Sequence, residues 1–481
     1  MKILVEHNKI EEYCGIIGIS CNDFSFTVAN SIYTGLMSIQ HRGQLFSGIS
    51  TTSCDGKIST YKDIGLVSNV FKPKRIKTFS GNVGIGHVAY GALEDRNIEY
   101  AQPYHHKSDL LEFSLALNGT ITNYDEIKEY LINLGKVLVN NSDVELIATV
   151  IETFSRSSES MLDALKLLMN VLKGAFCLVL LTNEGELFVT RDPIGYKPLC
   201  YGIREDENRK FFIISSESCA IDAMEGKLKG DINPGEILHI DPLKGLKKYK
   251  IISRKSHAIC QYEFVYFARP DSIINGISVA DVRYRLGINL AQSDLKFNLD
   301  NTIVVPVPDS GRSAAMGYAW ESKIPYQEGL MKNRYLWQLK SDPNEKLNPV
   351  KPIVVGKNVI LVDDSMLSGV TMKKIILMLR KAGAVAIHVR IACPPIVNEC
   401  QINNSFSNRE LLIAYQKKKL NRKDYIEEIR KYIQADSLKF QTNENLIKSI
   451  SLDKNEICFN CLKDDSIKLD EKKEEEMELI M

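Results

Sequence analysis

Residues 359–371 read Val-Ile-Leu-Val-Asp-Asp-Ser-Met-Leu-Ser-Gly-Val-Thr, and this stretch decides the fold of the second half of the chain. Its first four residues form an unbroken apolar run, which is typical of a strand buried on both faces of a parallel sheet. Ile375, Ile376 and Leu379 then recur at helical spacing. We therefore predict a strand, a loop and a helix within an α/β fold.

The loop between this strand and this helix carries the side chains expected at a sugar-phosphate site. Ligands of open α/β sheets bind at the carboxyl ends of strands, and the amides that begin a helix favour a phosphate. Asp363 and Asp364 would accept hydrogen bonds from two ribose hydroxyls, while Ser368, Gly369 and Thr371 surround the phosphate. The alternative is that the two aspartates only cap the helix.

A second segment repeats this pattern. The apolar run at 303–307 is followed by Asp309, Ser310 and Gly311, and by Arg312 at the start of a helix rich in small residues. Two such loops on one parallel sheet would bind the phosphate and the pyrophosphate of an activated ribose. Mg²⁺ would accompany the pyrophosphate.

Composition narrows the class of protein. The chain has 481 residues, enough for two domains, and a net charge of +1 that gives no sign of a nucleic-acid binder. No run of about eighteen apolar residues predicts a membrane span. Residues 1–13 contain three glutamates and no apolar signal core, so we expect a cytoplasmic protein whose eleven cysteines are reduced thiols or metal ligands.

The pattern of elements changes midway along the chain. From 14 to 245 short strands alternate with helices, as in a sheet-rich layered domain, with strands expected near 82–90, 175–181 and 211–215. Units of strand, loop and helix follow at 302–320 and 358–382. We therefore predict a leader at 1–13, a first domain at 14–245, a second domain at 250–465 and a charged tail at 466–481.

Cys14 would become the first residue if the leader were removed. Its own α-amine, with an ordinary pKa of about 7.7–8.0, would then activate the thiol as a nucleophile. Asn118 and Gly119 would supply an oxyanion hole, and Asp143 would bind a substrate ammonium. The alternative is that Cys14 is a small buried core residue.

From Cys14 to Cys461 the chain resembles the amidophosphoribosyltransferase family, in its form with a leader peptide and an iron–sulfur cluster. The resemblance is carried by the ordered segments 40–44, 118–119, 262–272, 306–311, 332–335 and 362–365. It implies an N-terminal-nucleophile glutaminase with an αββα sandwich, followed by a type I phosphoribosyltransferase domain with a mostly parallel sheet. It further implies a homotetramer that is inhibited by purine nucleotides.

The implied reaction takes ammonia from glutamine and transfers it to phosphoribosyl pyrophosphate, giving 5-phosphoribosylamine in the first step of purine synthesis. By resemblance Cys14 is the nucleophile, Asn118 and Gly119 form the oxyanion hole, and Asp143 binds the glutamine amine. The implied ligands of the second substrate are as follows: Asp363 and Asp364 for ribose hydroxyls and Mg²⁺, Ser365, Gly369 and Thr371 for the 5′-phosphate, and Asp309, Ser310 and Gly311 for the pyrophosphate, with Ser310 also near Mg²⁺.

Cys458 and Cys461 have the spacing that lets two sulfurs face one metal centre. On spacing alone the pair fits a zinc half-site, a redox pair or no site at all. The resemblance adds Cys260 and Cys400 and implies a [4Fe–4S] cluster, although Cys393 lies close to Cys400 in the sequence.

The match also breaks at several positions. Ala89 stands where the family has an arginine for the glutamine carboxylate, Leu45 and Phe46 replace a glutamate and a glycine, and Ser368 replaces an arginine of the phosphate loop. The loop 336–340 lacks its usual arginine, leaving Lys340 there, and Arg96 is a candidate substitute in the first domain. These changes leave two alternatives open: a paralogue with another amine donor or phosphosugar, or a non-catalytic ligand-binding relative.

Overall fold

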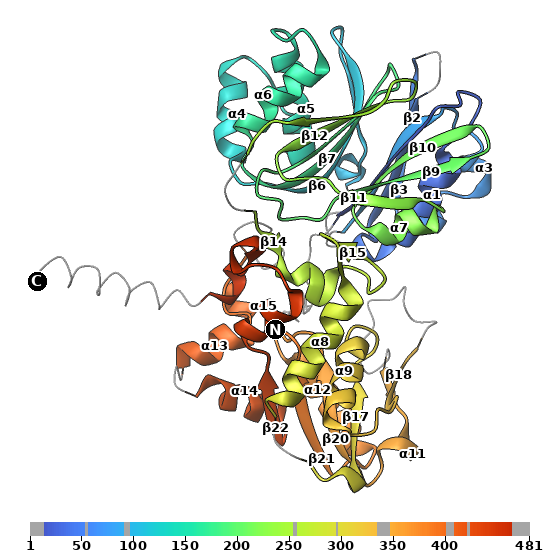
Figure 1. Ribbon diagram of the computed structural model, residues 1–481. Helices are drawn as coiled ribbons and strands as arrows, with labels where there is room; N and C mark the ends of the chain where they lie inside the picture. The colour runs from blue at the N-terminus through green and yellow to red at the C-terminus, as the bar shows by residue number, and fades with distance from the viewer. Residues whose placement is uncertain are drawn as a thin grey trace, which may run out of the picture.

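The computed structural model describes residues 14–52, 56–90, 97–253, 257–294, 297–333, 347–400, 408–420 and 424–463. The predicted leader, the predicted charged tail, the loop 336–340 and Arg96 lie outside the described residues. Two domains follow one another along the chain, the first at the top of Figure 1 and the second below it.

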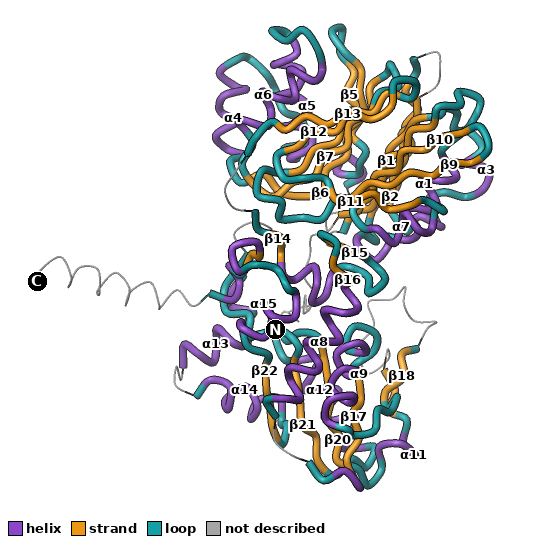
Figure 2. The backbone as a smooth tube through the Cα atoms, in the orientation of Figure 1, coloured by secondary structure: helices purple, strands orange, loops and turns teal. Residues whose placement is uncertain are grey.

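The first domain contains two antiparallel sheets that face each other (Figure 2). One sheet has the order β11-β9-β10-β1-β4-β2-β3 and the other β13-β12-β8-β7-β6-β5. The strands of the first sheet are β1 (Cys14–Cys21), β2 (Phe46–Thr52), β3 (Ile58–Ile64), β4 (Val83–Ala89), β9 (Cys200–Asp206), β10 (Arg209–Ser215) and β11 (Lys227–Asp231). Those of the second are β5 (Tyr104–Lys107), β6 (Glu112–Ile121), β7 (Gly174–Thr182), β8 (Leu187–Arg191), β12 (Glu236–Asp241) and β13 (Gly245–Lys250).

Helices cover the outer face of each sheet, which gives the four layers of the predicted αββα sandwich (Figure 1). The outer helices of the first sheet are α1 (Ala29–Ser38), α2 (Val67–Val70), α3 (Pro73–Ile76) and α7 (Ser218–Ala223), and those of the second are α4 (Tyr124–Asn133), α5 (Asp143–Ser155) and α6 (Met161–Val171). Alternation along β1 explains the layering, because Ile17 and Ile19 pack against α1 while Ile16 packs between the sheets.

The first domain extends beyond residue 245, and its last strand ends at Lys250. β13 pairs with β12 from Glu236–Lys250 to Asp241–Gly245, and Ile251 and Ile252 pack against the core under the second sheet. This lysine-rich segment is an edge strand, where exposed lysines are common because they discourage pairing with other chains.

The second domain is built on the predicted parallel sheet, in the order β17-β20-β21-β22. Its strands are β17 (Thr302–Pro306), β20 (Asn358–Asp363), β21 (Ala386–Ile391) and β22 (Ser437–Phe440). Its helices are α8 (Val279–Gln292), α9 (Arg312–Ser322), α11 (Lys351–Val354), α12 (Val370–Lys381), α13 (Ile413–Leu420), α14 (Tyr425–Ile433) and α15 (Asn443–Ile450). The predicted units at 302–320 and 358–382 are β17 with α9 and β20 with α12.

Short strand pairs complete this domain: β14 (Ile259–Cys260) with β23 (Ile457–Cys458), β15 (Ile273–Ile274) with β16 (Ile277–Ser278), and β18 (Leu330–Lys332) with β19 (Leu347–Pro349). Helices α8 and α9 cross in backbone contact, because a Cβ at Gly287 would lie 1.9 Å from the carbonyl oxygen of Ala314. Among the described residues, no helix combines the length and apolar character that crossing a bilayer requires.

Candidate active sites

Cys14 begins β1 and is half-buried. In the sheet it lies directly opposite Ala89 of β4, and Ala89 in turn lies opposite Phe46 of β2. Leu45, Phe46, Ala89 and Ala101 form one buried cluster against which Cys14 packs. Three of the positions at which we expect departures from the family pattern therefore meet at the thiol.

Asn118 and Gly119 lie near the end of β6. The Asn118 side chain is fully buried, and neither its amide nitrogen nor its amide oxygen has a hydrogen-bond partner among the described residues. Gly119 has a φ of 150°, and a Cβ there would lie 2.0 Å from the carbonyl oxygen of Ala175, so only glycine fits. Buried amides are nearly always paired, and the free donor of Asn118 is suited to a ligand oxygen.

His87 connects Asn118 and Gly119 to the row of opposing residues Cys14, Ala89 and Phe46. It lies two residues before Ala89 on β4, and its Nε2 is 3.0 Å from the carbonyl oxygen of Leu117, which precedes Asn118. Burial lowers the pKa of His87 to about 4. The imidazole is therefore neutral near pH 7, and it ties the strand of Asn118 to the strand of Ala89.

Asp143 is the first residue of α5, and Ser142 caps this helix by accepting from the backbone nitrogen of Glu145. The Oδ2 of Asp143 accepts a hydrogen bond of 3.0 Å from the backbone nitrogen of Ile121, two residues after Gly119. Burial raises its pKa, so a substrate ammonium would stabilise the ionised carboxylate. The structure thus places Asp143 beside the strand that carries Asn118 and Gly119.

The acidic end of β20 lies in the second domain. The backbone nitrogen of Asp364 donates to Asp363 Oδ1 at 2.9 Å, and Ser365 Oγ donates to Asp364 Oδ1 at 2.6 Å. Ser365 Oγ is also 2.7 Å from the hydroxyl of Tyr262. The aspartates end the strand without entering helix α12, which starts at Val370.

The predicted phosphate-binding loop runs from Ser365 to the start of α12. Gly369 takes a left-handed conformation, with φ 74°, as the residue before the helix, and a Cβ there would lie 2.9 Å from the side chain of Ile413. The carbonyl of Leu367 accepts from the backbone nitrogen of Ile413, which fastens α13 to the loop. Thr371 lies in the first turn of α12, where its position fits the predicted contact with a phosphate.

The loop after β17 lies beside the loop after β20, because these two strands pair in parallel. A Cβ at Gly311 would lie 2.5 Å from the carbonyl oxygen of Val362. Asp309 accepts from Lys332 Nζ at 2.9 Å and lies 3.3 Å from Arg312, while Ser310 occupies the turn between them. The structure therefore brings 309–311 next to 363–364, as the two-loop prediction requires.

A buried ion cluster joins the two domains. Arg42 Nη1 is 2.5 Å from Glu217, its Nη2 is 2.7 Å from Glu263, and its Nε donates to the carbonyl of Cys14 at 3.2 Å. All three charged side chains are fully buried. Although burial opposes the charge, Glu263 and Glu217 raise the pKa of Arg42. Arg42 thus ties Cys14 to the second domain.

Glu263 and Tyr262 are neighbours in the chain, at the start of the π-helix Glu263–Phe267. Glu263 contacts Arg42, and Tyr262 contacts Ser365 of the phosphate loop. The sequence alone assigns no role to Arg42, Glu217, Tyr262 or Glu263. Three of them lie in segments 40–44 and 262–272, which carry the family resemblance, so the polar residues of these segments were the available signal.

Four cysteines gather at the junction of the domains. Cys260 lies opposite Cys458 in the parallel pairing of β14 with β23, and Cys461 follows one turn later. Burial, and then the charges of Cys458 and Cys400, raise the pKa of Cys260; burial, and then the charges of Cys260 and Cys400, raise that of Cys461. Cys393 also acts on Cys461, though after the other two.

These thiols suit a group of soft metal ions, because thiolates favour iron–sulfur clusters and zinc. Among the described residues, no three His, Cys, Asp or Glu side chains close around a single metal ion. Gln261 Nε2 lies 3.8 Å from the sulfur of Cys461, and the backbone nitrogens of Val397 and Asn398 donate to the carbonyl of Cys461. The surrounding donors therefore fix the position of this residue.

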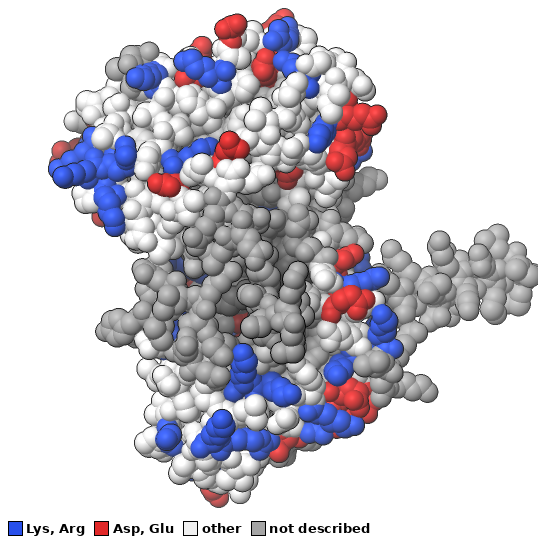
Figure 3. Space-filling view, turned by 180° about the vertical axis from the view of Figure 1, so that it is seen from behind, with Lys and Arg blue, Asp and Glu red and all other residues white. Residues whose placement is uncertain are grey.

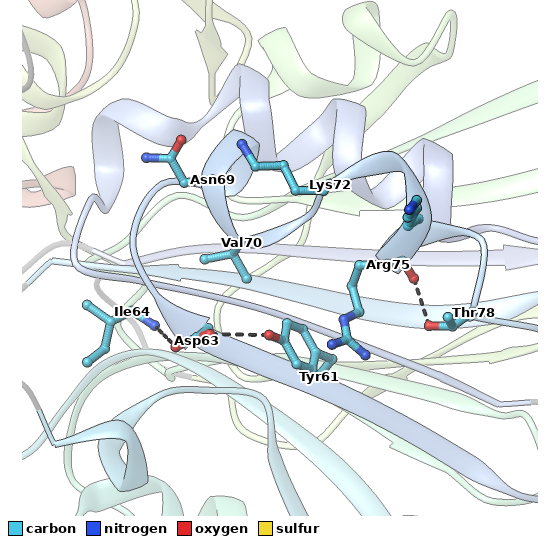
Figure 4. Close-up of a pocket in the computed structure, with 9 residues that line it drawn as sticks. Tyr61, Asp63, Ile64, Asn69, Val70, Lys72, Arg75 and Thr78 are labelled. Carbon is cyan, nitrogen blue, oxygen red and sulfur yellow. Dashed lines mark hydrogen bonds between the residues drawn. The ribbon is translucent and has the colours of Figure 1, made fainter.

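A depression of about 570 Å³ lies elsewhere, on the outside of the first domain between β3 and helices α2 and α3 (Figure 4). Arg75 stacks there over the ring of Tyr61 at 3.9 Å. None of the predicted site residues lines it. The face seen from behind carries acidic and basic side chains on both domains (Figure 3), in agreement with the small net charge.

Known proteins resemble the chain along nearly its whole length. Residues 93–223 match a glutamine amidotransferase domain and residues 285–410 a phosphoribosyl transferase domain. The amidophosphoribosyltransferase of Methanocaldococcus jannaschii is 38% identical, covering 93% of this chain and 96% of the relative; that of Pyrococcus horikoshii is 40% identical, covering 90% and 92%.

Solved structures agree with these relatives. The glutamine phosphoribosylpyrophosphate amidotransferase from B. subtilis, solved with ADP and GMP, superposes with a TM-score of 0.84 at 35% identity, covering 94% of this chain and 96% of that one. The fold, the order of the two domains and the near-full-length matches all agree with those of the amidophosphoribosyltransferases. This chain belongs to the amidophosphoribosyltransferase family.

Proposed function

We propose that the chain transfers ammonia from glutamine to phosphoribosyl pyrophosphate, giving 5-phosphoribosylamine, pyrophosphate and glutamate. The observation that carries this proposal is the buried amide of Asn118, which has no hydrogen-bond partner among the described residues, next to Leu117, which His87 links to the strand opposite Cys14. The same chain carries the paired loops at 309–311 and 363–371. Neither site alone requires the other. Together, with Arg42 between them, they fit an enzyme that makes ammonia in one domain and consumes it in the next.

In the first half-reaction the sulfur of Cys14 attacks the amide carbon of glutamine. A C–S bond forms, the C–N bond breaks, and ammonia leaves with the proton of the thiol, which the α-amine of Cys14 transfers. Asn118 Nδ2 and the backbone nitrogen of Gly119 stabilise the oxyanion of the intermediate, and Asp143 binds the substrate ammonium. Water then hydrolyses the thioester to glutamate.

In the second half-reaction ammonia attacks the anomeric carbon of the ribose while the bond to pyrophosphate breaks. Asp363 and Asp364 accept hydrogen bonds from the ribose hydroxyls, Ser365, Gly369 and Thr371 surround the 5′-phosphate, and 309–311 lie beside the leaving pyrophosphate. One or two carboxylates together with the substrate phosphates are enough to bind Mg²⁺. Asp363, Asp364 and Ser310 therefore fit this ion, which would neutralise charge on the pyrophosphate.

We also propose that Cys260, Cys400, Cys458 and Cys461 hold a [4Fe–4S] cluster with a structural role. The support is the gathering of these four thiols at the domain junction. Anaerobic reconstitution with iron and sulfide should give a chain that absorbs visible light and binds about four iron atoms. Cys458→Ser should lose both the absorbance and the iron. Cys393→Ser is the matched control, and loss of the cluster in this variant instead would reassign the fourth ligand.

The function is tested by measuring pyrophosphate release from phosphoribosyl pyrophosphate with either ammonia or glutamine as donor. Cys14→Ala should abolish the reaction with glutamine and leave the reaction with ammonia. Intact-mass measurement of purified protein should show a chain that begins at Cys14, since the α-amine is needed as a base. Turnover with neither donor by cluster-loaded protein would contradict the proposal and favour a ligand-binding relative.

For assembly and regulation we propose a cytoplasmic homotetramer inhibited by purine nucleotides. The B. subtilis relative, which was solved with ADP and GMP, supports the part of this proposal that concerns nucleotides. The tetramer and the cytoplasmic location rest on the family resemblance alone. Size-exclusion chromatography with light scattering should give four times the chain mass, and GMP should lower the rate of pyrophosphate release. A monomer that is insensitive to nucleotides would contradict this proposal.

A further inference from the structure

The surroundings of Cys14 are apolar on the side where Ala89 faces it. Four uncharged side chains, those of Leu45, Phe46, Ala89 and Ala101, form the cluster that contacts Cys14. The register of β1, β4 and β2 sets Cys14, Ala89 and Phe46 in one row on one face of the sheet. A carboxylate brought against this row would lose hydration without gaining a partner from these side chains.

Among the described residues, two cations contact the backbone of this region, Arg42 and Lys62, and both are engaged. Arg42 is fully buried between Glu217 and Glu263 and also donates to the carbonyl of Cys14. Lys62 donates to the carbonyl of Ala101 at 2.5 Å, and burial lowers its pKa. A ligand carboxylate would have to displace an existing contact of one of them.

Another part of the proposed site favours a positive charge. The carboxylate of Asp143 accepts a hydrogen bond from the backbone nitrogen of Ile121, two residues after Gly119. A ligand with a primary amide at Cys14 and an ammonium at Asp143 therefore meets complementary groups at both ends. A further negative charge on the same ligand meets the apolar cluster.

We propose that the Cys14 site takes primary amides that carry an ammonium group and no α-carboxylate, in addition to glutamine. The inference rests on the proposed function, because it uses the same nucleophile and the same thioester chemistry. The smallest such donor is 4-aminobutanamide, which is glutamine without its carboxylate. Thiolysis of its amide releases ammonia, and hydrolysis of the thioester gives 4-aminobutanoate.

The test compares three donors by ammonia release and by pyrophosphate release. We expect kcat/KM for 4-aminobutanamide to lie within about tenfold of that for glutamine, since the carboxylate contributes little here. Glutaramic acid, which keeps the carboxylate and lacks the amine, should be at least about tenfold poorer than glutamine because it loses a charge-assisted contact with Asp143. An inert 4-aminobutanamide beside active glutamine overturns the inference and leaves the proposed function intact.

Two variants sharpen the comparison. Ala89→Arg with Phe46→Ser, which opens room opposite residue 89, should raise kcat/KM for glutamine about tenfold or more and leave that for 4-aminobutanamide unchanged. Lys62→Met should change both donors equally. A selective loss of glutamine activity in Lys62→Met would show that Lys62 holds the carboxylate, which overturns the inference.

The outcomes also separate the two proposals. If ammonia supports pyrophosphate release and none of the amides does, in the wild type or in either variant, then the glutaminase part of the proposed function fails and this inference fails with it. Circular dichroism of each variant shows whether it is folded. The Phe46→Ser single variant, which adds no cation, should show no gain for glutamine, and a gain there would overturn the assignment to the new charge.

Discussion

Arg42 is expected to be the most costly single side chain to remove from the domain junction. It neutralises Glu217 at 2.5 Å and Glu263 at 2.7 Å, and all three side chains are fully buried. Arg42→Met would leave two carboxylates buried with one shared counter-charge gone. Removing one partner of a buried ion pair costs about 3–5 kcal/mol, so we expect the free energy of unfolding to fall by about that amount, a large share of the roughly 5–15 kcal/mol typical of a protein.

The assay is urea unfolding at pH 7, followed by circular dichroism. Lys166→Met is the matched control, since Lys166 pairs with Asp163 at 2.8 Å with both side chains about two-fifths exposed, and such pairs contribute about 0–1 kcal/mol. Adding Glu217→Gln and Glu263→Gln to Arg42→Met should restore part of the loss, because the stranded charges are gone. A loss in Arg42→Met no larger than that in Lys166→Met would refute the reasoning.

Three further results are expected. Asn118→Ala should lower kcat with glutamine by about 10²–10³-fold, the effect of losing one oxyanion-hole donor, and leave ammonia-dependent pyrophosphate release unchanged; equal losses with both donors would contradict the assignment. His87 has a pKa of about 4 in the folded chain against 6.5 ordinarily, so the unfolded state binds the extra proton and stability should fall as the pH drops from about 6.5 to 4, by about 3 kcal/mol in total. His87→Asn should remove this dependence in urea titrations, and an unchanged pH profile would count against it. Tyr262→Phe removes the hydrogen bond to Ser365, worth about 0.5–1.5 kcal/mol, so KM for phosphoribosyl pyrophosphate in the ammonia reaction should rise about two- to tenfold, whereas an unaltered KM would mean that this bond does not position the loop.

The second domain was predictable because its signals are local. The apolar run at 359–362 needs both faces covered, which requires a parallel sheet with helices, and the acidic residues that follow it fall at the carboxyl end of β20. In the first domain, too, the strands expected at 175–181 and 211–215 are parts of β7 and β10. In these segments the residues nearby in sequence decide the structure.

The shape of the first site was not predictable, because it depends on register between distant strands. Leu45 and Ala89 are far apart in the sequence and meet only through the pairing of β2 with β4. A shift of one residue would turn Ala89 to the other face, so no local pattern reveals that these residues share one cluster. Nothing in the sequence near Glu217 predicts that it is buried and paired with Arg42, because the fold alone brings these two residues together.

The position of residues 258–263 has a consequence for evolution by recombination. The backbone nitrogens of Ala258 and Cys260 donate to the carbonyls of Ile194 and Tyr196 in the first domain, while Cys260 pairs with Cys458 near the end of the chain. Relatives could be recombined by exchanging whole domains at the boundary in the sequence. In such a hybrid, residues 258–263 would come from a different parent than one of the two domains that they contact. Productive exchanges are therefore expected to carry residues 258–263 together with Glu217, so that the heritable module is the junction and not either domain.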